Sequence, residues 1–300
     1  MVQLKEKLCS LAGAAKLIKN GSRIAFGGFT IHNHPMAFIY ELIRQGVKDL
    51  TIVGFTNGNE VDILVGAGCV KRIETCYVGL EKFGVAPNFR RAVEKGEIEV
   101  VEYSEDLAIE RFQCSARGDP FIPSRILFGS DIPKYNRDIK EGVSPLDGGK
   151  YHAIPPADPE WVIVHTPMGD RYGNALYFPN MQLPMNWDLV MTRTTNKVIV
   201  TVEQIIDRER VLRLSHLNMI PRFRNVAIVE APYGAHPSSY LQLYNFDAEH
   251  LTMYARLARD PAEFKKYLDK YVYGVKSHLD YLKLIGVENL MKIRHVGGGL

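Results

Sequence analysis

The 300-residue sequence carries 37 Lys and Arg against 34 Asp and Glu, a formal net charge of +3, and 46% of its residues are hydrophobic. This apolar content is sufficient for a folded core and excludes an intrinsically disordered chain. The near balance of charge argues against a nucleic-acid-binding protein, which would carry an excess of basic residues. The length allows one large domain or two of medium size.

The N-terminal stretch 1–21 places Lys5, Lys7, Lys16 and Lys19 around short apolar pieces. This pattern predicts an amphipathic helix, because the continuous apolar region and cleavage site of a secretory signal are missing. The sequence has no apolar run of the roughly 18 residues that a membrane span needs. We therefore expect a cytoplasmic protein without membrane contact.

The cysteines show neither a C-x-x-C pair nor a Cys/His cluster with zinc spacing. We expect Cys9, Cys69, Cys76 and Cys114 to be reduced thiols, mostly buried, with no metal ion bound and no disulfide formed. We also expect no permanently bound cofactor.

The N-terminal part alternates short apolar runs with stretches of helical periodicity. We expect strands at 22–26, 49–55, 71–79 and 98–104, and helices at 36–45, 88–95 and 105–118. Ser104 is a suitable N-cap of the last helix, and Gly118 a suitable stop. This alternation predicts βαβ units and an α/β fold with a largely parallel sheet covered on both faces.

Residues 119–159 concentrate Pro, Gly, Asp and Ser, and we expect an irregular segment inside one domain that spans 1–300. Regular pattern returns after it. Strands are expected at 160–166, 197–205 and 225–232, a helix at 183–195, and a turn at 169–174. The C-terminal part, from Phe264 to Ile285, keeps apolar residues three or four apart, which predicts a long helix whose tyrosines pack into the core.

The first segment that could carry chemistry is Gly27-Gly28-Phe29-Thr30-Ile31-His32-Asn33-His34-Pro35, between a strand and a helix. Paired glycines allow close approach of the backbone to a ligand, and Pro35 fits the first turn of the helix. We expect free N–H groups here that suit a phosphate or a developing oxyanion. The segment lacks the glycine and lysine pattern of a nucleotide site, and a tight turn without a ligand is an equal alternative.

Two later segments also follow strands. In 168–175, Asp170 and Gly173 form a turn pair that the Asn174 side chain could fix. In 230–238, Gly234 and His236 lie at the carboxyl end of a strand, where open α/β sheets bind ligands. A loop histidine without a ligand is the competing interpretation for His236.

Together with these segments, the runs LIRQGVKDLTIVG, PFIPSR and LYNFDAEHLTMYARL make the chain resemble the α subunits of family I CoA-transferases, of the glutaconate CoA-transferase type. The resemblance covers about residues 4–290. It implies the three-layer α/β/α fold of the CoA-transferase, ribose-5-phosphate isomerase and glucosamine-phosphate deaminase superfamily. It also implies a β-subunit partner, in a heterotetramer or larger, and coenzyme A thioesters as substrates.

In this family a glutamate attacks the acyl-CoA thioester, and the resulting anhydride is opened by CoA. In two-chain members that glutamate lies on the β chain in a Ser-Glu-Asn-Gly-like context. Here residues 57–60 and 287–290 do not match that context, so we expect the nucleophile on the partner chain. We also expect part of the hydrophobic content of this chain to lie in the interface with that partner.

By resemblance the glycine loop lies at the active site. Its catalytic contribution is expected from the Gly28 backbone and the Asn33 side chain, with substrate or CoA contacts from Gly27, Phe29, Thr30, Arg125, Asn174, Gly234 and His236.

Glu105 and Arg125 depart from the transferase pattern. A related branch, the α subunits of hydrolases that open the last ring of degraded steroids as CoA thioesters, has an acid and an arginine there and uses the glutamate as a base. Glu105 also suits the first turn of a helix, where acids offset the dipole, and Arg125 also suits a solvated loop. Further alternatives are an acyl-CoA decarboxylase and a sugar-phosphate-binding member of the superfamily.

Overall fold

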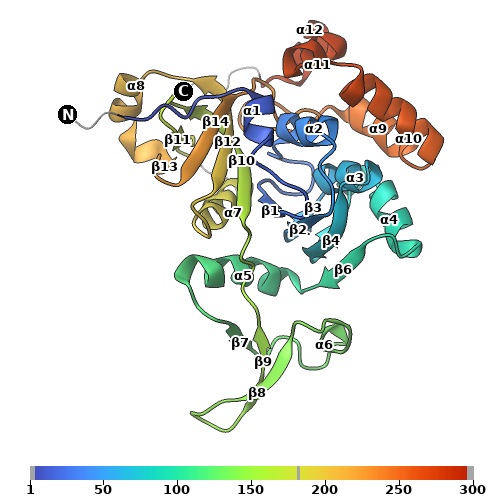
Figure 1. Ribbon diagram of the computed structural model, residues 1–300, viewed down its shortest axis with the longest axis vertical. Coiled ribbons are helices and arrows are strands. Elements are labelled where there is room, and N and C mark those ends of the chain that lie inside the picture. Colours follow the sequence, from blue (N-terminus) through green and yellow to red (C-terminus); the bar gives the residue numbers. More distant parts are fainter. Residues whose placement is uncertain (1–3, 181–182, 296–300) are drawn as a thin grey trace.

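The computed structural model describes residues 4–180 and 183–295, and its centre is a sheet of nine strands in that part of the chain. The parallel strands run in the order β14-β12-β10-β1-β2-β4-β6, and two short antiparallel strands, β11 and β13, continue from β10 (Figure 1). The parallel strands are β1 (Arg23–Phe26), β2 (Leu50–Val53), β4 (Val70–Thr75), β6 (Glu99–Glu102), β10 (Trp161–Gly169), β12 (Val198–Ile205) and β14 (Asn225–Glu230). The antiparallel ones are β11 (Ala175–Leu176) and β13 (Asn218–Ile220).

Helices cover both faces of the sheet, which gives the three-layer α/β/α fold expected from the sequence. One face is covered by α1 (Leu11–Ala15), α2 (Met36–Arg44), α3 (Asn59–Gly66) and α4 (Pro87–Glu94). The other face is covered by α5 (Glu105–Arg117) and α7 (Leu183–Thr192). The strand order reverses direction between β1 and β10, so the connections after these strands leave to opposite sides.

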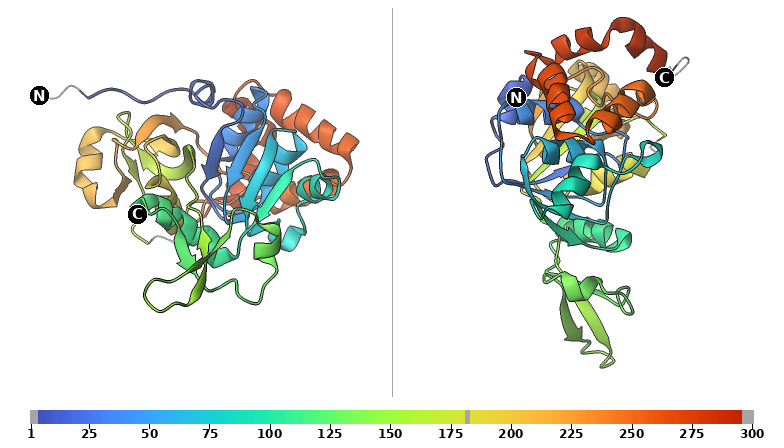
Figure 2. Two further views of the ribbon diagram at one scale, coloured as in Figure 1. Left: turned by 60° about the horizontal axis from the view of Figure 1, so that its bottom comes forward. Right: turned by 90° about the vertical axis from the view of Figure 1, so that its right-hand side faces the viewer.

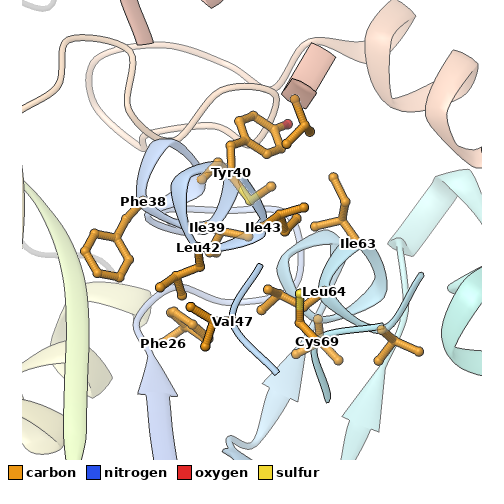
Figure 3. Packing of buried hydrophobic residues seen from close by; sticks show 14 of the residues in the cluster. Phe26, Phe38, Ile39, Tyr40, Leu42, Ile43, Val47, Ile63, Leu64 and Cys69 are labelled. Carbon is orange, nitrogen blue, oxygen red and sulfur yellow. The ribbon is translucent and has the colours of Figure 1, made fainter. Parts of the chain in front are cut away.

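Two apolar clusters, one on each face, hold these layers together. In the first, α2 and α3 pack on β1 and β2 through side chains such as Leu42 and Leu64, both without solvent exposure (Figure 3). In the second, Leu107 and Phe112 of α5 pack against the opposite face. Because β1, β2 and β10 are buried on both faces, they read as continuous apolar runs in the sequence.

Ser104 and Gly118 bound α5 as predicted: the Ser104 hydroxyl accepts a hydrogen bond from Leu107 N–H, and Gly118 is left-handed with φ of 76°. Between β2 and β4, the sequence pattern did not indicate α3. Its Asn59, Glu60 and Asp62 are buried, which removes the polar outer face that helical periodicity needs.

The predicted N-terminal amphipathic helix is wrong for most of its length. Residues 1–3 lie outside the described part of the chain, and within 4–21 only Leu11–Ala15 are helical, with Ser10 as N-cap and extended chain from 4 to 9. Leu8 forms a parallel bridge with Ile228, and Cys9 N–H donates to the Ile228 carbonyl. This segment therefore covers the outer edge of β14, whose backbone groups would otherwise lack partners.

The predicted long helix from Phe264 to Ile285 is wrong as well, because it is broken into α10 (Pro261–Leu268), a π-helical turn (Asp269–Tyr273) and α11 (His278–Ile285). Two further helices flank it, α9 (Ala248–Leu257) and α12 (Val287–Ile293). The break follows Gly274, and Ser277 caps α11 by accepting from Asp280 N–H. The tyrosines pack in the core as expected: Tyr267, Tyr271 and Tyr281 are buried over α2.

The Pro- and Gly-rich segment is more regular than predicted and forms an arm that projects from the body below α5 (Figures 1 and 2). It contains an antiparallel sheet in the order β7-β9-β8 and a short helix: β7 (Ile122–Ser124), β8 (Lys140–Val143), β9 (Lys150–Ile154) and α6 (Ile132–Tyr135). The sequence does not predict these strands because they are short and because a proline, Pro123, argues against a strand at β7. The proline is tolerated there because β7 is an edge strand, where a missing N–H breaks no hydrogen bond of the sheet.

A buried carboxylate, Glu74 of β4, ties this arm to the body. It accepts hydrogen bonds from Arg23 at 2.6 and 2.7 Å and from Arg111 at 2.6 Å. The same two arginines donate to the carbonyls of Pro155 and Ala157 at 3.0 Å, where the arm returns to the sheet. Burial alone would raise the pKa of Glu74, but the bonds and charges of Arg23 and Arg111 lower it to about 2.

We expect Glu74→Gln to lower the free energy of unfolding by about 3–5 kcal/mol, because it leaves the buried Arg111 guanidinium without a counter-charge. Glu99→Gln is the matched control: Glu99 binds Arg72, which also lies 3.0 Å from Glu74, but the Glu99 side chain is 58% exposed, and we expect a loss below about 1 kcal/mol. Chemical denaturation of both variants measures the difference.

The stabilisation by Glu74 should also depend on pH. Its pKa is lower in the folded than in the unfolded chain, so the contribution is complete above the unfolded value and is lost as the pH falls toward 2. Equal losses in the two variants, or a Glu74→Gln effect that persists at low pH, would contradict this account.

Candidate active site

A cavity of about 500 Å³ lies where β1, β2, β4 and β6 end, at the carboxyl edge of the sheet. Each of these strands supplies residues from the connection that follows it, including the short strands β3 (Thr56–Asn57) and β5 (Tyr77–Val78). The lining residues are Phe29, Thr30, Thr56, Cys76, Tyr77, Glu81, Glu102, Tyr103, Ser104, Glu105 and Ile132. Open α/β sheets bind ligands at this edge, and three predicted site residues, Phe29, Thr30 and Glu105, meet here.

The glycine loop after β1 forms one wall of the cavity, but its amides are already bonded within the chain. Gly27 N–H donates to Ile163 O at 2.8 Å, Gly28 N–H to Asp188 Oδ1 at 2.8 Å, and Thr30 N–H to Thr56 O at 3.0 Å. The prediction of free loop amides is therefore wrong for Gly27, Gly28 and Thr30. The residues that take up these donors lie far away in the sequence, on β10, α7 and β3.

His34 holds the loop from the side of α2 and α3. Its Nδ1 lies 2.8 Å from the Gly27 carbonyl, and its Nε2 lies 2.9 Å from the Thr30 carbonyl and 3.0 Å from Glu60 Oε2. Since both ring nitrogens face only acceptors, both must donate, which makes this buried ring an imidazolium. Burial opposes the charge, but Glu60 and the two carbonyls outweigh it and raise the pKa of His34.

Asp188 holds the loop from the opposite face of the sheet. Its carboxylate is completely buried, accepts from Gly28 N–H, and lies 3.5 Å from the Tyr177 hydroxyl. Burial raises the pKa of Asp188 to about 7, although the Gly28 amide partly offsets this. The loop is thus fastened between two buried acids, Asp188 directly and Glu60 through His34.

The glycines of this loop are required by close packing. A Cβ on Gly27 would lie 2.5 Å from Asp188 Oδ1, and one on Gly28 would lie 2.5 Å from the His32 carbonyl oxygen and from His34 Nδ1. Gly28 also has a φ of 102°, which other residues rarely adopt. The missing side chains therefore let Asp188 approach Gly27 and let His32 and His34 approach Gly28.

Glu105 is the first residue of α5, and its exposed side chain lines the cavity. Burial, and then the charge of the nearby Glu105, raise the pKa of the Cys76 thiol, which also lines the cavity, to about 12. This thiol donates to the Phe55 carbonyl at 2.8 Å. Cys76 is therefore a protonated, hydrogen-bonded thiol at neutral pH, and Glu105 is one of three glutamates that line the cavity, with Glu81 and Glu102.

Asn33, predicted as a side-chain donor to the substrate, is fully buried and does not line the cavity. Its Oδ1 accepts from Leu241 N–H at 3.0 Å, and its Nδ2 has no hydrogen-bond partner among the described residues.

Arg125 lies on the arm, outside the cavity lining. It is 60% exposed and forms an ion pair with Asp147 at 2.9 Å. The structure therefore does not bring Arg125 together with Glu105.

The two later segments also lie outside the cavity. Asn174 fixes the predicted turn: its Nδ2 donates to Asp170 Oδ2 at 2.7 Å, while Asp170 Oδ1 accepts from two backbone amides. Gly234 packs against His165, and its carbonyl accepts from Ala37 N–H at 2.8 Å. His236 is buried between the Tyr281 hydroxyl at 2.7 Å and Asp247 at 3.1 Å. Substrate contact by these residues stays a prediction.

Most of the cavity wall and both acids that fasten the loop were not predicted from the sequence. Thr56 directly follows a predicted strand, so the strand end was a usable signal for it, whereas Cys76 and Tyr103 lie within predicted strands that in the structure end just before them, at Thr75 and Glu102. Asp188 had no such signal, because it lies within a helix 160 residues from Gly28.

The described part of the chain offers neither a metal site nor a membrane span. No group of three or more His, Cys, Asp or Glu is arranged there to hold a metal ion. None of the helices there combines the length and apolarity that crossing a bilayer requires. All four cysteines are free thiols.

The three-layer fold is that of glutaconate coenzyme A-transferase from Acidaminococcus fermentans, whose solved structure matches with a TM-score of 0.91 at 30% identity over 97% of this chain and 96% of that one. The family model described as Coenzyme A transferase matches residues 10–231. The chain belongs to the coenzyme A transferase family.

Curated relatives agree with this assignment. Over 95% of its length the chain is 30% identical to one of the subunits of the glutaconate CoA-transferase of Acidaminococcus fermentans, and it covers 93% of that relative. It is 29% identical to the cholesterol ring-cleaving hydrolase IpdA subunit of Rhodococcus jostii, over 91% of this chain and 94% of that one. A protein of Archaeoglobus fulgidus is 38% identical over 94% of this chain, which spans 63% of that relative's length.

We expect Gly28→Ala to destabilise the fold more than Gly84→Ala. Gly84 has nearly the same φ, 101°, but nothing lies within 4 Å of an added Cβ. Both variants incur about 1–2 kcal/mol from the left-handed backbone. Only Gly28→Ala also drives a methyl group into His32 and His34, which adds about 1–3 kcal/mol of overpacking. Denaturation curves for both variants test this, and equal losses would show that the packing of the loop is unimportant.

Proposed function

We propose that this chain is the α subunit of a two-chain cytoplasmic enzyme that moves CoA between carboxylic acids, as in glutaconate-type transferases, in a heterotetramer or larger. The β subunit carries the nucleophilic glutamate and closes the cavity. Coenzyme A thioesters are the substrates, and no resident cofactor takes part. The names of relatives, which include glutaconate and 3-oxoadipate CoA-transferase subunits, support this assignment.

The observation that carries the proposal is an open cavity in a chain that lacks a glutamate in the Ser-Glu-Asn-Gly-like context of the family nucleophile. Glu60, in the nearest approach to the family context, is completely buried and occupied by His34 and by the Gly58 amide at 2.8 Å. A glutamate held in this way has no free oxygen for attack on a thioester. This occupation of Glu60 supports an attacking carboxylate on the partner chain.

In this mechanism the partner's glutamate attacks the thioester carbonyl and expels CoA as the thiolate. CoA then opens the resulting anhydride to give an enzyme thioester and the free acid, and a second acid reverses both steps. Phe29 and Thr30 form the wall of this chain against the acyl group. Gly27 and Gly28 hold that wall in place through Asp188 and His34.

Exposed apolar side chains on the arm support the inference that a partner chain binds there. Tyr135 is 84% exposed, Val143 63% and Leu146 95%. Exposed apolar groups gathered on one element are typical of interaction surfaces. Ile132, on the same helix as Tyr135, lines the cavity, so a chain that covers the arm is near the site.

Trapping the intermediate tests the proposal. The chain is co-expressed with its β subunit, and the complex is incubated with acyl-CoA and then with hydroxylamine or borohydride. We expect mass spectrometry to find one modified glutamate on the β chain and none on this chain. Turnover without any modified glutamate, or modification of Glu105, would contradict the proposal.

A second candidate is hydrolysis of a CoA thioester with Glu105 as general base, as implied by resemblance to the steroid ring-opening branch. The observation in its favour is that the Glu105 carboxylate lines the cavity. A base within reach of a water molecule typically contributes about 10²–10⁴-fold to the rate.

Glu105→Gln separates the two candidates. If the enzyme is a hydrolase, we expect thioester hydrolysis to fall by about 10²-fold or more. If it is a transferase with its nucleophile on the partner, CoA transfer should persist. Asp106→Asn is the control, because Asp106 shares the first turn of α5 but does not line the cavity. Unchanged hydrolysis in Glu105→Gln rules out the role of Glu105 as base.

A further inference from the structure

A second groove lies beside the candidate active site. It has a volume of about 380 Å³ and lies between a single 3₁₀ turn, η1 (Glu81–Phe83), and the helices α4 and α9. Glu81, at the start of η1, lines the active-site cavity, whereas Phe83, at its end, lines this groove. One short turn of helix therefore separates the two sites.

The groove carries an excess of positive charge. Arg90, Arg91 and Arg259 line it together with one acid, Glu94. Glu94 pairs with Arg90 at 2.7 Å. In the part of the chain that the structure describes, neither Arg91 nor Arg259 forms an ion pair with a carboxylate. Two guanidinium charges therefore remain without a counter-charge in the groove.

Arg91 is held in position by polar groups that lead into the core. Its Nη1 donates to the carbonyls of Ala258 at 3.0 Å and Arg259 at 3.3 Å, and its Nη2 donates to Asn88 Oδ1. Asn88 is buried, and its Nδ2 donates to the buried Asp62 carboxylate at 3.1 Å. These bonds occupy at most three of the five N–H groups of the guanidinium, and all of their acceptors are neutral oxygens. Arg91 is thus a half-buried, oriented cation that still has donors free for an anion.

The groove and the cavity suit the two ends of a CoA thioester. The nucleotide end of CoA carries a diphosphate and a 3′-phosphate, and the uncharged pantetheine chain links it to the thioester. The cavity is lined by Glu81, Glu102 and Glu105, with no Lys, Arg or His among its described lining residues, so phosphates are repelled there. Guanidinium groups bind phosphate through paired N–H donors, which places the phosphates in the neighbouring groove.

The groove also offers apolar surface for the base of the nucleotide. Phe83 and Val85 line it beside the arginines, and the Val85 side chain is 59% exposed. A purine ring can pack on an aromatic or aliphatic side chain of this kind.

We propose, on the basis of the transferase function above, that the groove between α4 and α9 binds the phosphorylated nucleotide end of the CoA thioester, with Arg91 and Arg259 on its phosphates. The thioester then lies in the cavity on the other side of η1. Because the nucleotide does not react, the two arginines determine the affinity for CoA and take no part in the chemistry.

Titration calorimetry on the complex of this chain with its β subunit tests the proposal, with CoA, adenosine 3′,5′-bisphosphate and pantetheine as ligands. We expect Arg259→Gln and Arg91→Gln each to weaken the binding of CoA and of the bisphosphate about tenfold, because each removes charge-assisted bonds to phosphate. Higher ionic strength should weaken the binding of both ligands in the unaltered complex. Arg259 is exposed, so its variant should fold even if Arg91→Gln, which loses bonds to the end of α9, does not.

Arg256→Gln is the matched control. Arg256 is exposed on the same helix and does not line the groove, so we expect the affinity for CoA to stay within about twofold. Pantetheine has no phosphate and should bind all of these proteins alike.

Equal affinity for CoA in the unaltered complex and in Arg259→Gln overturns the assignment of the groove. So does an equal loss in Arg256→Gln, or a matching loss of pantetheine binding, because either would show that the phosphates do not contact Arg259. These outcomes leave the transferase function to be decided by the trapped glutamate on the β chain, whereas a complex that binds no CoA removes both.

Discussion

Two buried acids fasten the glycine loop, and the shape of the site depends on them. Asp188 takes the Gly28 amide from one face of the sheet, and Glu60 holds His34, which takes the Gly27 and Thr30 carbonyls, from the other. Charges without solvent are costly unless hydrogen bonds satisfy them. Here the Gly28 amide bonds Asp188, and His34, Asn57 and the Gly58 amide bond Glu60, so the loop and the two acids are held in one arrangement.

This arrangement changes the meaning of the paired glycines. A loop with paired glycines before a helix suggests free amides that could bind an anion, as in phosphate sites. In this chain positions 27 and 28 require glycine because Asp188, His32 and His34 of the same chain pack directly against them. What the loop offers to a ligand is the side-chain surface of Phe29 and Thr30.

The body of the protein and its arm are joined by a different ionic cluster. Glu74 binds Arg23 and Arg111, and these arginines also hold the backbone of 155–157. Since Ile132 of the arm lines the cavity, this cluster also helps to fix the site. The cavity thus has one wall from the sheet and one from the arm, and it leaves room for the partner chain that the proposed function requires.

The sequence by itself determined the local elements and the class of fold. Apolar runs predicted β1, β2, β10 and β12, and the caps Ser104 and Gly118 fixed the limits of α5, because strand burial and helix capping are properties of a few neighbouring residues. It also placed Phe29, Thr30 and Glu105 at strand ends, and the structure brings these three residues to one cavity.

Only the tertiary structure decided which groups meet. Asp188 accepts a hydrogen bond from Gly28, which is 160 residues away in the sequence. His236 is hydrogen-bonded to Tyr281 and Asp247, and Arg125 lies on the arm in an ion pair with Asp147. Residues 119–159 read as irregular because their strands are short and stabilised by one another and by Glu74, not by their own periodicity. Hydrogen bonds and ion pairs between distant residues leave no periodic signal in the chain, and therefore only the folded protein shows them.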